Sequence, residues 1–286
     1  MKIGALILNW QNYEDTLATL HSLNSLESPV PLRIMVVDDA SPNASAEALR
    51  AFDSKFDYHI VVNEENKGTT ISLNVGLRKL LSDESVTHIW FLDHDLEFGP
   101  EILNPLIAKF ENDAHDVAYT IAYKELECLN IHSFGGYISP WTCRAGDISR
   151  EVPDHKLDYF GFASILFARS AIESVGEFDE TFFIYWSDVD YSLRMKSAGL
   201  RCVPCLDSKC FHKESSTKKK YYHPKVYPDS VISRIYFFDK HYSNRLISMI
   251  LVTFYELVKI ILWRSDGSFA ELFSALLQVP KVQRTK

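Results

Sequence analysis

The sequence predicts an α/β fold: a mostly parallel β-sheet with helices on both faces. In the first third of the chain, short apolar runs alternate with segments in which leucines recur at helical spacing. The apolar runs are nearly continuous, as is typical of parallel strands that are covered on both sides. Polar residues follow each run, where the carboxyl ends of parallel strands would share one edge.

The expected elements follow one another at the spacing of strand–helix repeats. Strand-like runs cover residues 2–10, 32–41, 58–66 and 87–95. Helices are expected at 12–26, from about Ser45, and at 71–81. Farther along, helices are expected at 170–175, ending at Gly176, and at 187–199, closing at Gly199. Residues 119–160 contain no motif, and residues 132–146 are expected to form loops beside the site.

The composition is that of a globular protein with a sizeable core. The 286 residues are 47% hydrophobic and 13% aromatic, enough for one large domain or two merged halves. A net charge of −8 argues against general nucleic-acid binding. Five cysteines, an odd number, favour a reducing, cytoplasmic location over a disulfide framework. The apolar N-terminus suits a strand, and no small-residue cleavage site follows it.

Polar residues end four successive predicted strands. They are Asn9 and Asn12, Asp38 and Asp39, Asn66 and Gly68, and Asp93 and Asp95. Each position alone is typical of a turn or a helix cap. Four in succession indicate a ligand site at the carboxyl edge of the sheet. The pair Asp93 and Asp95 suits a hard divalent cation, which prefers oxygen ligands and shares them with substrate phosphates.

Residues 162–212 contain a second polar group. Asp188 lies near the start of a predicted helix, where the helix dipole stabilises a carboxylate. An Asp at such a position is usually a cap. Beside a substrate cleft, however, it would be an ionised carboxylate on a rigid element, which is what a general base requires.

These segments resemble family 2 glycosyltransferases of the GT-A fold, in particular rhamnosyltransferase-like bacterial members. The matching pieces, in order, are ILNWQN, VVDDAS, NKGTTISLNVG, LDHD and GEFDETFFIYWSDVDYSLRMKSAG, followed by His212. The resemblance implies one GT-A domain with a nucleotide-sugar-binding half (1–96) and an acceptor-binding, catalytic half (97–215). Residues 216–286 would then form an extension, a basic loop followed by an amphipathic helix.

The resemblance also implies roles for individual residues. Nucleotide-sugar binding falls to Asn9, Asn12, Asp39, Asn66, Gly68 and Asp93. Asp39 matches the acid that pairs with the base, and Asp93 matches the first acid of the DxD motif, near the ribose. Asp95 matches the last acid, which holds Mg²⁺ or Mn²⁺ against the diphosphate. His212 matches a histidine that completes the metal site in some members, although a structural histidine is the alternative. His94 is the variable middle residue and receives no role.

Asp188 matches the acid of the family's ED motif, the base that deprotonates the acceptor hydroxyl. In-line attack would then invert the anomeric carbon while the metal stabilises the leaving diphosphate. Two departures from the family pattern stand out. Ser187 replaces the glutamate of the ED motif, with Asp190 a less favoured substitute base. Leu73 occupies the place of an arginine that some members carry.

The sequence therefore predicts an inverting, metal-dependent glycosyltransferase of hexosyl or rhamnosyl type. It would move a sugar from a nucleotide diphosphate donor, foremost a UDP- or dTDP-sugar, to a hydroxyl of a cell-surface polysaccharide or glycolipid precursor. A catalytically inactive carbohydrate-binding or scaffold relative is one alternative, since Ser187 replaces an acid. A nucleotidyltransferase is another, but it would be expected to carry a glycine-rich basic loop, which LNWQNYEDTL lacks.

Two further segments leave alternatives open. The stretch CVPCLDSKCFH offers four soft zinc ligands, Cys202, Cys205, Cys210 and His212, but lacks the long loop that usually separates two ligand pairs. Residues 213–230 are basic and aromatic. They form either a solvated loop or a basic flap that contacts the donor diphosphate or a lipid-linked phosphate.

The tail is nearly continuous in apolar residues from Leu246 to Trp263. Eighteen residues only reach the lower limit for a membrane span, and two charges argue against spanning. At 100° per residue the interrupting polar residues fall on one arc and leave a wide apolar face: Ser248, Thr253, Glu256 and Lys259. Such a helix packs on the catalytic domain, joins a homo-oligomer or lies in the interface of the cell membrane, on its inner face.

Overall fold

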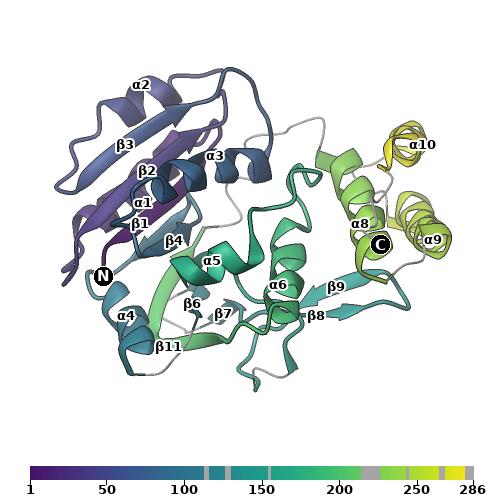
Figure 1. Cartoon of the computed structure of the whole chain (residues 1–286). Helices are drawn as coiled ribbons and strands as arrows, with labels where there is room; N and C mark the ends of the chain where they lie inside the picture. Colours follow the sequence, from purple (N-terminus) through teal and green to yellow (C-terminus); the bar gives the residue numbers. More distant parts are fainter. Residues whose placement is uncertain are drawn as a thin grey trace.

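The computed structural model describes residues 1–112, 116–125, 130–153, 156–213, 226–242, 245–263 and 268–280 (Figure 1). A nine-stranded sheet forms the centre, in the order β3-β2-β1-β4-β10-β6-β11-β5, with β7 paired to β6. Its strands are β1 (Ile3–Asn9), β2 (Leu32–Asp38), β3 (Asp57–Val62), β4 (His88–Leu92), β5 (Leu96–Phe98), β6 (Val117–Glu125), β7 (Asn130–Ser133), β10 (Ser164–Ala168) and β11 (Cys202–His212). A separate hairpin contains β8 (Gly136–Ser139) and β9 (Arg144–Asp147).

The sheet has a parallel half and a mixed half. Strands β1 to β4 all run parallel, and their strand–helix alternation is the one that the sequence predicts. Beyond β4 the direction changes, because β10 is antiparallel to both β4 and β6. Strand β11 then runs parallel to β6 and antiparallel to β5. The predicted α/β class with a mostly parallel sheet is confirmed, and the mixed half lies downstream of the four predicted strands.

Helices cover both faces of the sheet, as predicted. On one face lie α1 (Tyr13–Asn24), α2 (Ser45–Arg50) and α4 (Leu103–Asn112), and on the other lie α3 (Thr69–Leu81), α5 (Arg169–Val175) and α6 (Ser187–Ser197). Strand side chains alternate between the two layers: Ile3, Ala5 and Ile7 pack under α1, while Leu6 packs under α3. All four are fully buried, which explains why the strands read as unbroken apolar runs.

In the described part of the C-terminal extension, seen on the right of Figure 1, there are three more helices. They are α8 (Val226–Tyr242), α9 (Arg245–Trp263) and α10 (Phe269–Gln278). Together with the β8–β9 hairpin they enclose a third apolar cluster, which includes Phe182 and Val189 from the loop and helix around Asp188. The extension is therefore packed against the second half of the sheet domain.

Two local expectations are wrong. Residues 132–146 form β7 and the β8–β9 hairpin instead of loops, since Gly136 to Ser139 pair in register with Asp147 to Arg144. Residues 226–230, expected to continue the loop, are the first turn of α8, where Pro228 is tolerated because the first-turn amides have no partner within the helix. Residues 214–225, the rest of that basic segment, lie outside the described residues.

A buried carboxylate joins the extension to α6. Asp190 is fully buried, and its oxygens contact Arg194 (2.9 Å) on its own helix and Lys240 (2.6 Å) and His241 (2.7 Å) on α8. Burial alone would raise the pKa of Asp190, but the hydrogen bond from His241 and the charges of Lys240 and Arg194 outweigh it and lower that pKa. The ionised carboxylate thus holds α8 against α6.

We expect Asp190→Asn to lower the free energy of unfolding by about 3 kcal/mol at neutral pH, because it removes the buried anion that the partly buried Arg194 and Lys240 contact. The folded-state pKa of Asp190 is lowered, so its contribution is complete above the ordinary carboxyl pKa of about 4 and is lost as the pH falls below it. The difference between wild type and variant should therefore shrink in acid. Urea denaturation at several pH values measures this, with exposed Asp207→Asn as the control; equal stabilities at neutral pH would contradict it.

Candidate functional site

The two predicted metal ligands, Asp95 and His212, meet at the carboxyl edge of the sheet, together with Asp93, which was expected near the ribose. Asp93 and Asp95 lie in the turn between β4 and β5, and His212 ends β11, directly opposite Leu96 in the antiparallel register. The Nε2 atom of His212 lies 3.1 Å from Asp95 Oδ1 and 3.5 Å from Asp93 Oδ2. One ligand atom from each residue lies within 4.8 Å of the other two. Asp95 and His212 are nearly buried, while Asp93 is about half exposed.

This donor set fits a hard divalent cation. Two carboxylates and one imidazole suit Mg²⁺ or Mn²⁺ better than a soft metal, and the exposed Asp93 leaves a side open to a ligand. Burial opposes ionisation of Asp95, but the hydrogen bond from His212 and the charges of His94 and His212 lower its pKa to about 2. Asp95 is therefore an anion at every physiological pH.

The zinc alternative is wrong. Cys202 packs in the core on one face of the sheet, while Cys205 and Cys210 pack in the core on the other. Burial also raises the pKa of the Cys210 thiol, which disfavours the thiolate that zinc requires. Within the described ranges, the one cluster of candidate metal ligands is Asp93, Asp95 and His212.

A buried threonine that sequence reasoning missed shapes residues 93–95, the turn of the candidate metal site, which we name the metal-site turn. The Thr19 hydroxyl on α1 lies 2.8 Å from the carbonyl oxygen of His94 and accepts the amide of Leu96 at 2.9 Å. Asp95 lies between these two residues, so Thr19 fixes the backbone on both sides of it. A threonine in the apolar stripe of a helix carries no motif that would have revealed this role.

Asn9 and Asn12 support the site from inside the fold. Asn9 is fully buried, donates to Asp38 Oδ2 (2.6 Å) and accepts from Thr16 (2.7 Å). Asn12 donates to Asp15 at 2.6 Å and lies 3.4 Å from the His94 ring. Their side chains connect the first strand ends to α1 and to the metal-site turn.

Asp39 holds the loop that precedes α3. Its Oδ1 accepts from the side chains of Asn63 (2.9 Å) and Ser72 (2.8 Å) and from the amide of Lys67 (2.9 Å). Its Oδ2 accepts from the amide of Gly68 (2.9 Å), which leaves that oxygen with capacity for another donor. Asn66 Oδ1, in the same loop, is buried and has no hydrogen-bond partner among the described residues. Asp39, Asn66 and Gly68 are thus brought together.

Gly68 allows this loop to lie against Phe183, in the segment that precedes α6. Its φ of +86° is in the region that favours glycine, and a Cβ there would lie 2.6 Å from the Phe183 carbonyl oxygen. Next to it, the Thr69 amide donates to that same oxygen at 2.6 Å. Farther along α3, the Asn74 side chain donates to the carbonyl oxygen of Phe178 and accepts from the amide of the same residue. Helix α3 therefore holds the loop that leads to Asp188.

Asp188 lies in the first turn of α6, just after Trp186, whose φ of +69° is unusual for a bulky residue. Trp186 is held by the rings of Phe237 (4.8 Å) and Phe238 (5.3 Å) on α8. Burial raises the pKa of Asp188, and the charge of Asp147 raises it further. A carboxyl group with a raised pKa is a better proton acceptor once it is ionised.

Ser187 and Asp190, the two residues near Asp188 that the sequence analysis compared with the family motif, both have partners within the fold. The Ser187 hydroxyl, in the place of the missing glutamate, donates to the Ile184 carbonyl at 3.2 Å. Asp190 is fully buried and already contacts Arg194 on its own helix and Lys240 and His241 on α8, which agrees with the preference for Asp188 as the base. Asp188 is the carboxylate of this turn that remains partly exposed.

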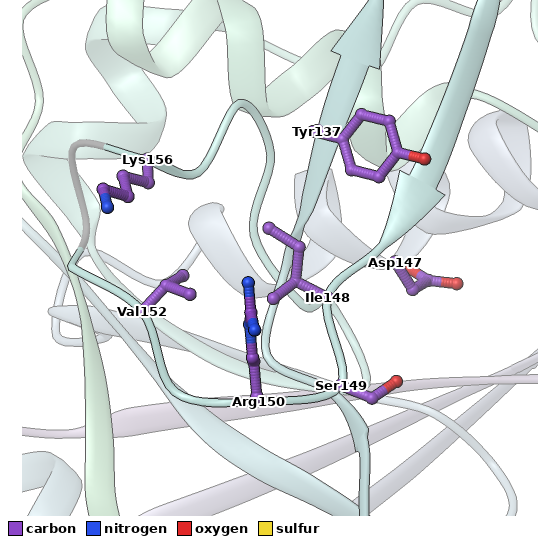
Figure 2. Close-up of a pocket in the computed structure, with 7 residues that line it drawn as sticks. All are labelled: Tyr137, Asp147, Ile148, Ser149, Arg150, Val152 and Lys156. Carbon is purple, nitrogen blue, oxygen red and sulfur yellow. The ribbon is translucent and has the colours of Figure 1, made fainter.

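A cavity of about 520 Å³ lies beside the β8–β9 hairpin (Figure 2). It is lined by Tyr137, Asp147, Ile148, Ser149, Arg150, Val152 and Lys156. Asp147 connects it to the Asp188 region, since its carboxylate accepts from the Tyr159 hydroxyl at 3.0 Å and its charge acts on Asp188. Figure 2 shows Arg150 standing between Val152 and Ile148. The cavity combines an aromatic ring with cationic side chains, in a region where the sequence has no motif.

The sequence profile described as Glycosyl transferase family 2 matches residues 6–173. The low-salt glycan biosynthesis hexosyltransferase Agl10 of Haloferax volcanii is 22% identical over 214 residues, which cover 71% of this chain and 64% of that protein. The chain thus spans just under two thirds of the length of this relative.

Two solved structures are similar over nearly the whole chain. The mannosyltransferase PcManGT from Pyrobaculum calidifontis, in complex with GDP-Man and Mn²⁺, has a TM-score of 0.56 at 14% identity, covering 96% of this chain and 68% of its own. GalNAc-T7, with UDP, GalNAc and Mn²⁺, has a TM-score of 0.69 at 13% identity, covering 96% and 54%. These likenesses confirm the GT-A fold expected from the sequence.

We expect Asp95→Asn to weaken Mn²⁺ binding by more than about a hundredfold, because it removes the buried anionic ligand. Electron paramagnetic resonance of free Mn²⁺ measures the affinity directly and requires no substrate. Asp188→Asn, which removes a carboxylate from the first turn of α6, is the matched control and should bind Mn²⁺ as the wild type does. Unchanged affinity in Asp95→Asn would refute the metal site.

We expect Thr19→Val to weaken Mn²⁺ binding about tenfold, because the turn that carries Asp95 loses its hydroxyl partner while the volume at position 19 is kept. Thr19→Ser retains the hydroxyl and should restore most of the affinity. If the valine and serine variants bind Mn²⁺ equally well, Thr19 does not position the metal site.

Proposed function

The chain belongs to glycosyl transferase family 2, and we propose that it is an inverting, metal-dependent enzyme that transfers a sugar from a nucleotide diphosphate donor to an acceptor hydroxyl. The observation that carries this proposal is the convergence of Asp93, Asp95 and His212 at the carboxyl edge of the sheet. Ligands of open α/β sheets bind at that edge.

The donor is proposed to lie between the Asp39 loop and the metal-site turn. Asp39 Oδ2 would accept a hydrogen bond from the base, Asn66 would use its buried Oδ1, and Gly68 would let the loop approach the ligand. Asn9 and Asn12 would act through the side chains that they hold, and Asp93 would bind near the ribose. The similar structures that contain GDP-Man or UDP support a nucleotide donor, and the hexosyltransferase relative supports a hexose, with rhamnose as a further candidate.

Asp95 and His212, together with Asp93, would hold Mg²⁺ or Mn²⁺. When bound, the cation supplies positive charge that stabilises the leaving nucleotide diphosphate. Mn²⁺ in the similar structures supports this assignment. The low pKa of Asp95 keeps this ligand ionised and ready for the cation.

Asp188 is proposed to be the catalytic base. Its carboxylate would accept the proton of the acceptor hydroxyl as the oxygen attacks the anomeric carbon from the face opposite the diphosphate, which inverts that centre. The acceptor would occupy the cavity beside β9, where Tyr137 offers a ring to a sugar and Arg150 and Lys156 offer charge to a phosphate or carboxylate. An acceptor from a cell-surface polysaccharide or glycolipid precursor has this chemistry.

An inactive carbohydrate-binding relative is the main competing interpretation, because Ser187 replaces an acid of the family motif. A nucleotidyltransferase is less well supported, since family membership does not favour it. The two competitors differ from the proposal in what they release: nothing in the first case and pyrophosphate in the second.

A donor screen tests the proposed function. UDP-, dTDP- and GDP-sugars are incubated with the protein and Mn²⁺, with and without short saccharide acceptors, and release of the nucleotide diphosphate is measured. Asp188→Asn should lower kcat by about a thousandfold or more while donor affinity and Mn²⁺ affinity remain unchanged. Donor binding without turnover in the wild type would favour the inactive relative.

The pH profile provides a separate prediction. Because the pKa of Asp188 is raised, the acid limb of kcat/KM should lie above the ordinary carboxyl pKa of about 4, with activity lost as the pH falls through it. Asp147→Asn removes a negative neighbour and should move that limb to lower pH. A limb that Asp147→Asn leaves in place would contradict this account of Asp188.

A further inference from the structure

Helix α9 has the opposite orientation from a typical surface helix, with its polar side inward and an apolar side exposed. Its charged residues turn toward the protein: Glu256 is only 3% exposed and pairs with Arg234 of α8 (3.3 Å) and with Lys259 (3.1 Å). Tyr255 lies between guanidinium groups, with its ring 4.6 Å from Arg234 and 4.8 Å from Arg144. The polar arc that the sequence marks on this helix therefore faces inward.

The opposite face of α9 is apolar and open. Among its described side chains, those that are exposed are all Leu, Ile or Phe: Leu246, Ile247, Ile250, Phe254, Ile261 and Leu262. Their exposed fractions range from 49% for Ile247 to 69% for Leu246. A surface helix normally shows its charged face to water, so this arrangement indicates an apolar occupant.

Helix α10 extends the same surface. It packs on α8 and α9, and Figure 1 shows α9 and α10 together at the outer end of the molecule. Phe269, Phe273 and Leu277 recur along it every four residues and are 58%, 66% and 74% exposed. We name the exposed apolar residues of α9 and α10 the outer apolar face. No described side chain that is exposed on either helix carries a charge.

The charge of the chain is divided between its two parts. Residues 1–212 contain 17 Lys and Arg against 32 Asp and Glu, a net charge of −15. Residues 213–286 contain 13 Lys and Arg against 6 Asp and Glu, a net charge of +7. The part of the sequence that carries the outer apolar face is thus cationic within an acidic protein.

We propose that the outer apolar face inserts into the headgroup region of an anionic lipid membrane. An uncharged apolar face with cationic sequence around it is the chemistry of helices that lie in a membrane interface. None of the described helices is long and apolar enough to cross a membrane, so contact is along the helices. A second copy fits less well, because a symmetric contact would bring two segments of +7 together, and protein interfaces include far more polar side chains.

Attachment at this face would also hold the proposed active site at a fixed orientation to the lipid. Asp229 near the start of α8 accepts the amides of Ile184 (3.2 Å) and Tyr185 (3.0 Å), and Lys240 and His241 near its end bind Asp190. Helix α8 therefore joins the outer apolar face to the turn that carries Asp188. A lipid-linked acceptor would meet the protein from this side.

Co-sedimentation of the full chain with vesicles tests the proposal. Vesicles of phosphatidylcholine with about one third phosphatidylglycerol should bind the wild type, while pure phosphatidylcholine should bind it more weakly. The double variant Phe254→Glu, Phe273→Glu should lower binding by more than about tenfold. Leu206→Glu, which places the same charge on an exposed apolar site of β11, is the matched control and should bind normally. About 0.5 M NaCl should weaken binding without abolishing it.

Mn²⁺ affinity and the thermal midpoint of the double variant show whether it is folded, and neither measurement depends on catalytic activity. Failure of the wild type to bind anionic vesicles would overturn the proposal. Equal binding by the double variant and Leu206→Glu would overturn the assignment to this face. A wild-type dimer in light scattering that the double variant dissociates, without vesicle binding, would show that a second copy covers the face instead.

Discussion

The contact between His212 and Asp95 is the constraint on which the site depends. Two carboxylates at the end of a buried strand repel each other unless a positive group lies between them. The Nε2 atom of His212 lies 3.1 Å from Asp95 and 3.5 Å from Asp93 and reduces this repulsion in part. A bound cation would reduce it further. This contact requires β11 to lie beside β5 and to run in the direction of β1 to β4, as it does through its parallel pairing with β6. The second half of the sheet thus brings a distant histidine to the carboxyl ends of the parallel strands.

The parallel half and most of the metal site were predictable, because their signals are local. Apolar runs followed by Asn or Asp identify strand ends, and parallel strands place those ends on one edge. His212 was assigned only through family resemblance, since nothing in its own neighbourhood indicates that it reaches Asp93. The hairpin at residues 136–147 was missed because its strands are only four residues long and rich in glycine and serine, a composition that also suits loops. Thr19 was missed because its role depends on a backbone turn far away in sequence.

Periodicity also could not decide the orientation of α9. The sequence marks an apolar face and a polar arc, and the usual rule buries the apolar face. Here the partner is α8, whose Arg234 is itself buried and requires an anion. Glu256 satisfies that requirement only if the polar arc turns inward, because an unpaired buried guanidinium costs more than exposed leucine. The buried Arg234–Glu256 pair therefore favours the inward orientation of the polar arc, alongside the packing of Val252 in the same cluster.

The two halves of the site are connected through short polar contacts and not through a shared apolar core alone. Asp39 holds the loop before α3, the start of α3 binds the Phe182 and Phe183 carbonyls, and α6 begins a few residues later. The Asp39 loop is therefore connected, through the start of α3, to the segment that leads to Asp188, and α8 holds that segment from the other side through Trp186. The contacts of α3 with Phe182 and Phe183, and of α8 with Trp186 itself, help to hold Trp186 in its strained backbone conformation. The loop proposed to bind the donor and the turn that carries the proposed base are thus both attached to one short segment, which α3 contacts from one side and α8 from the other.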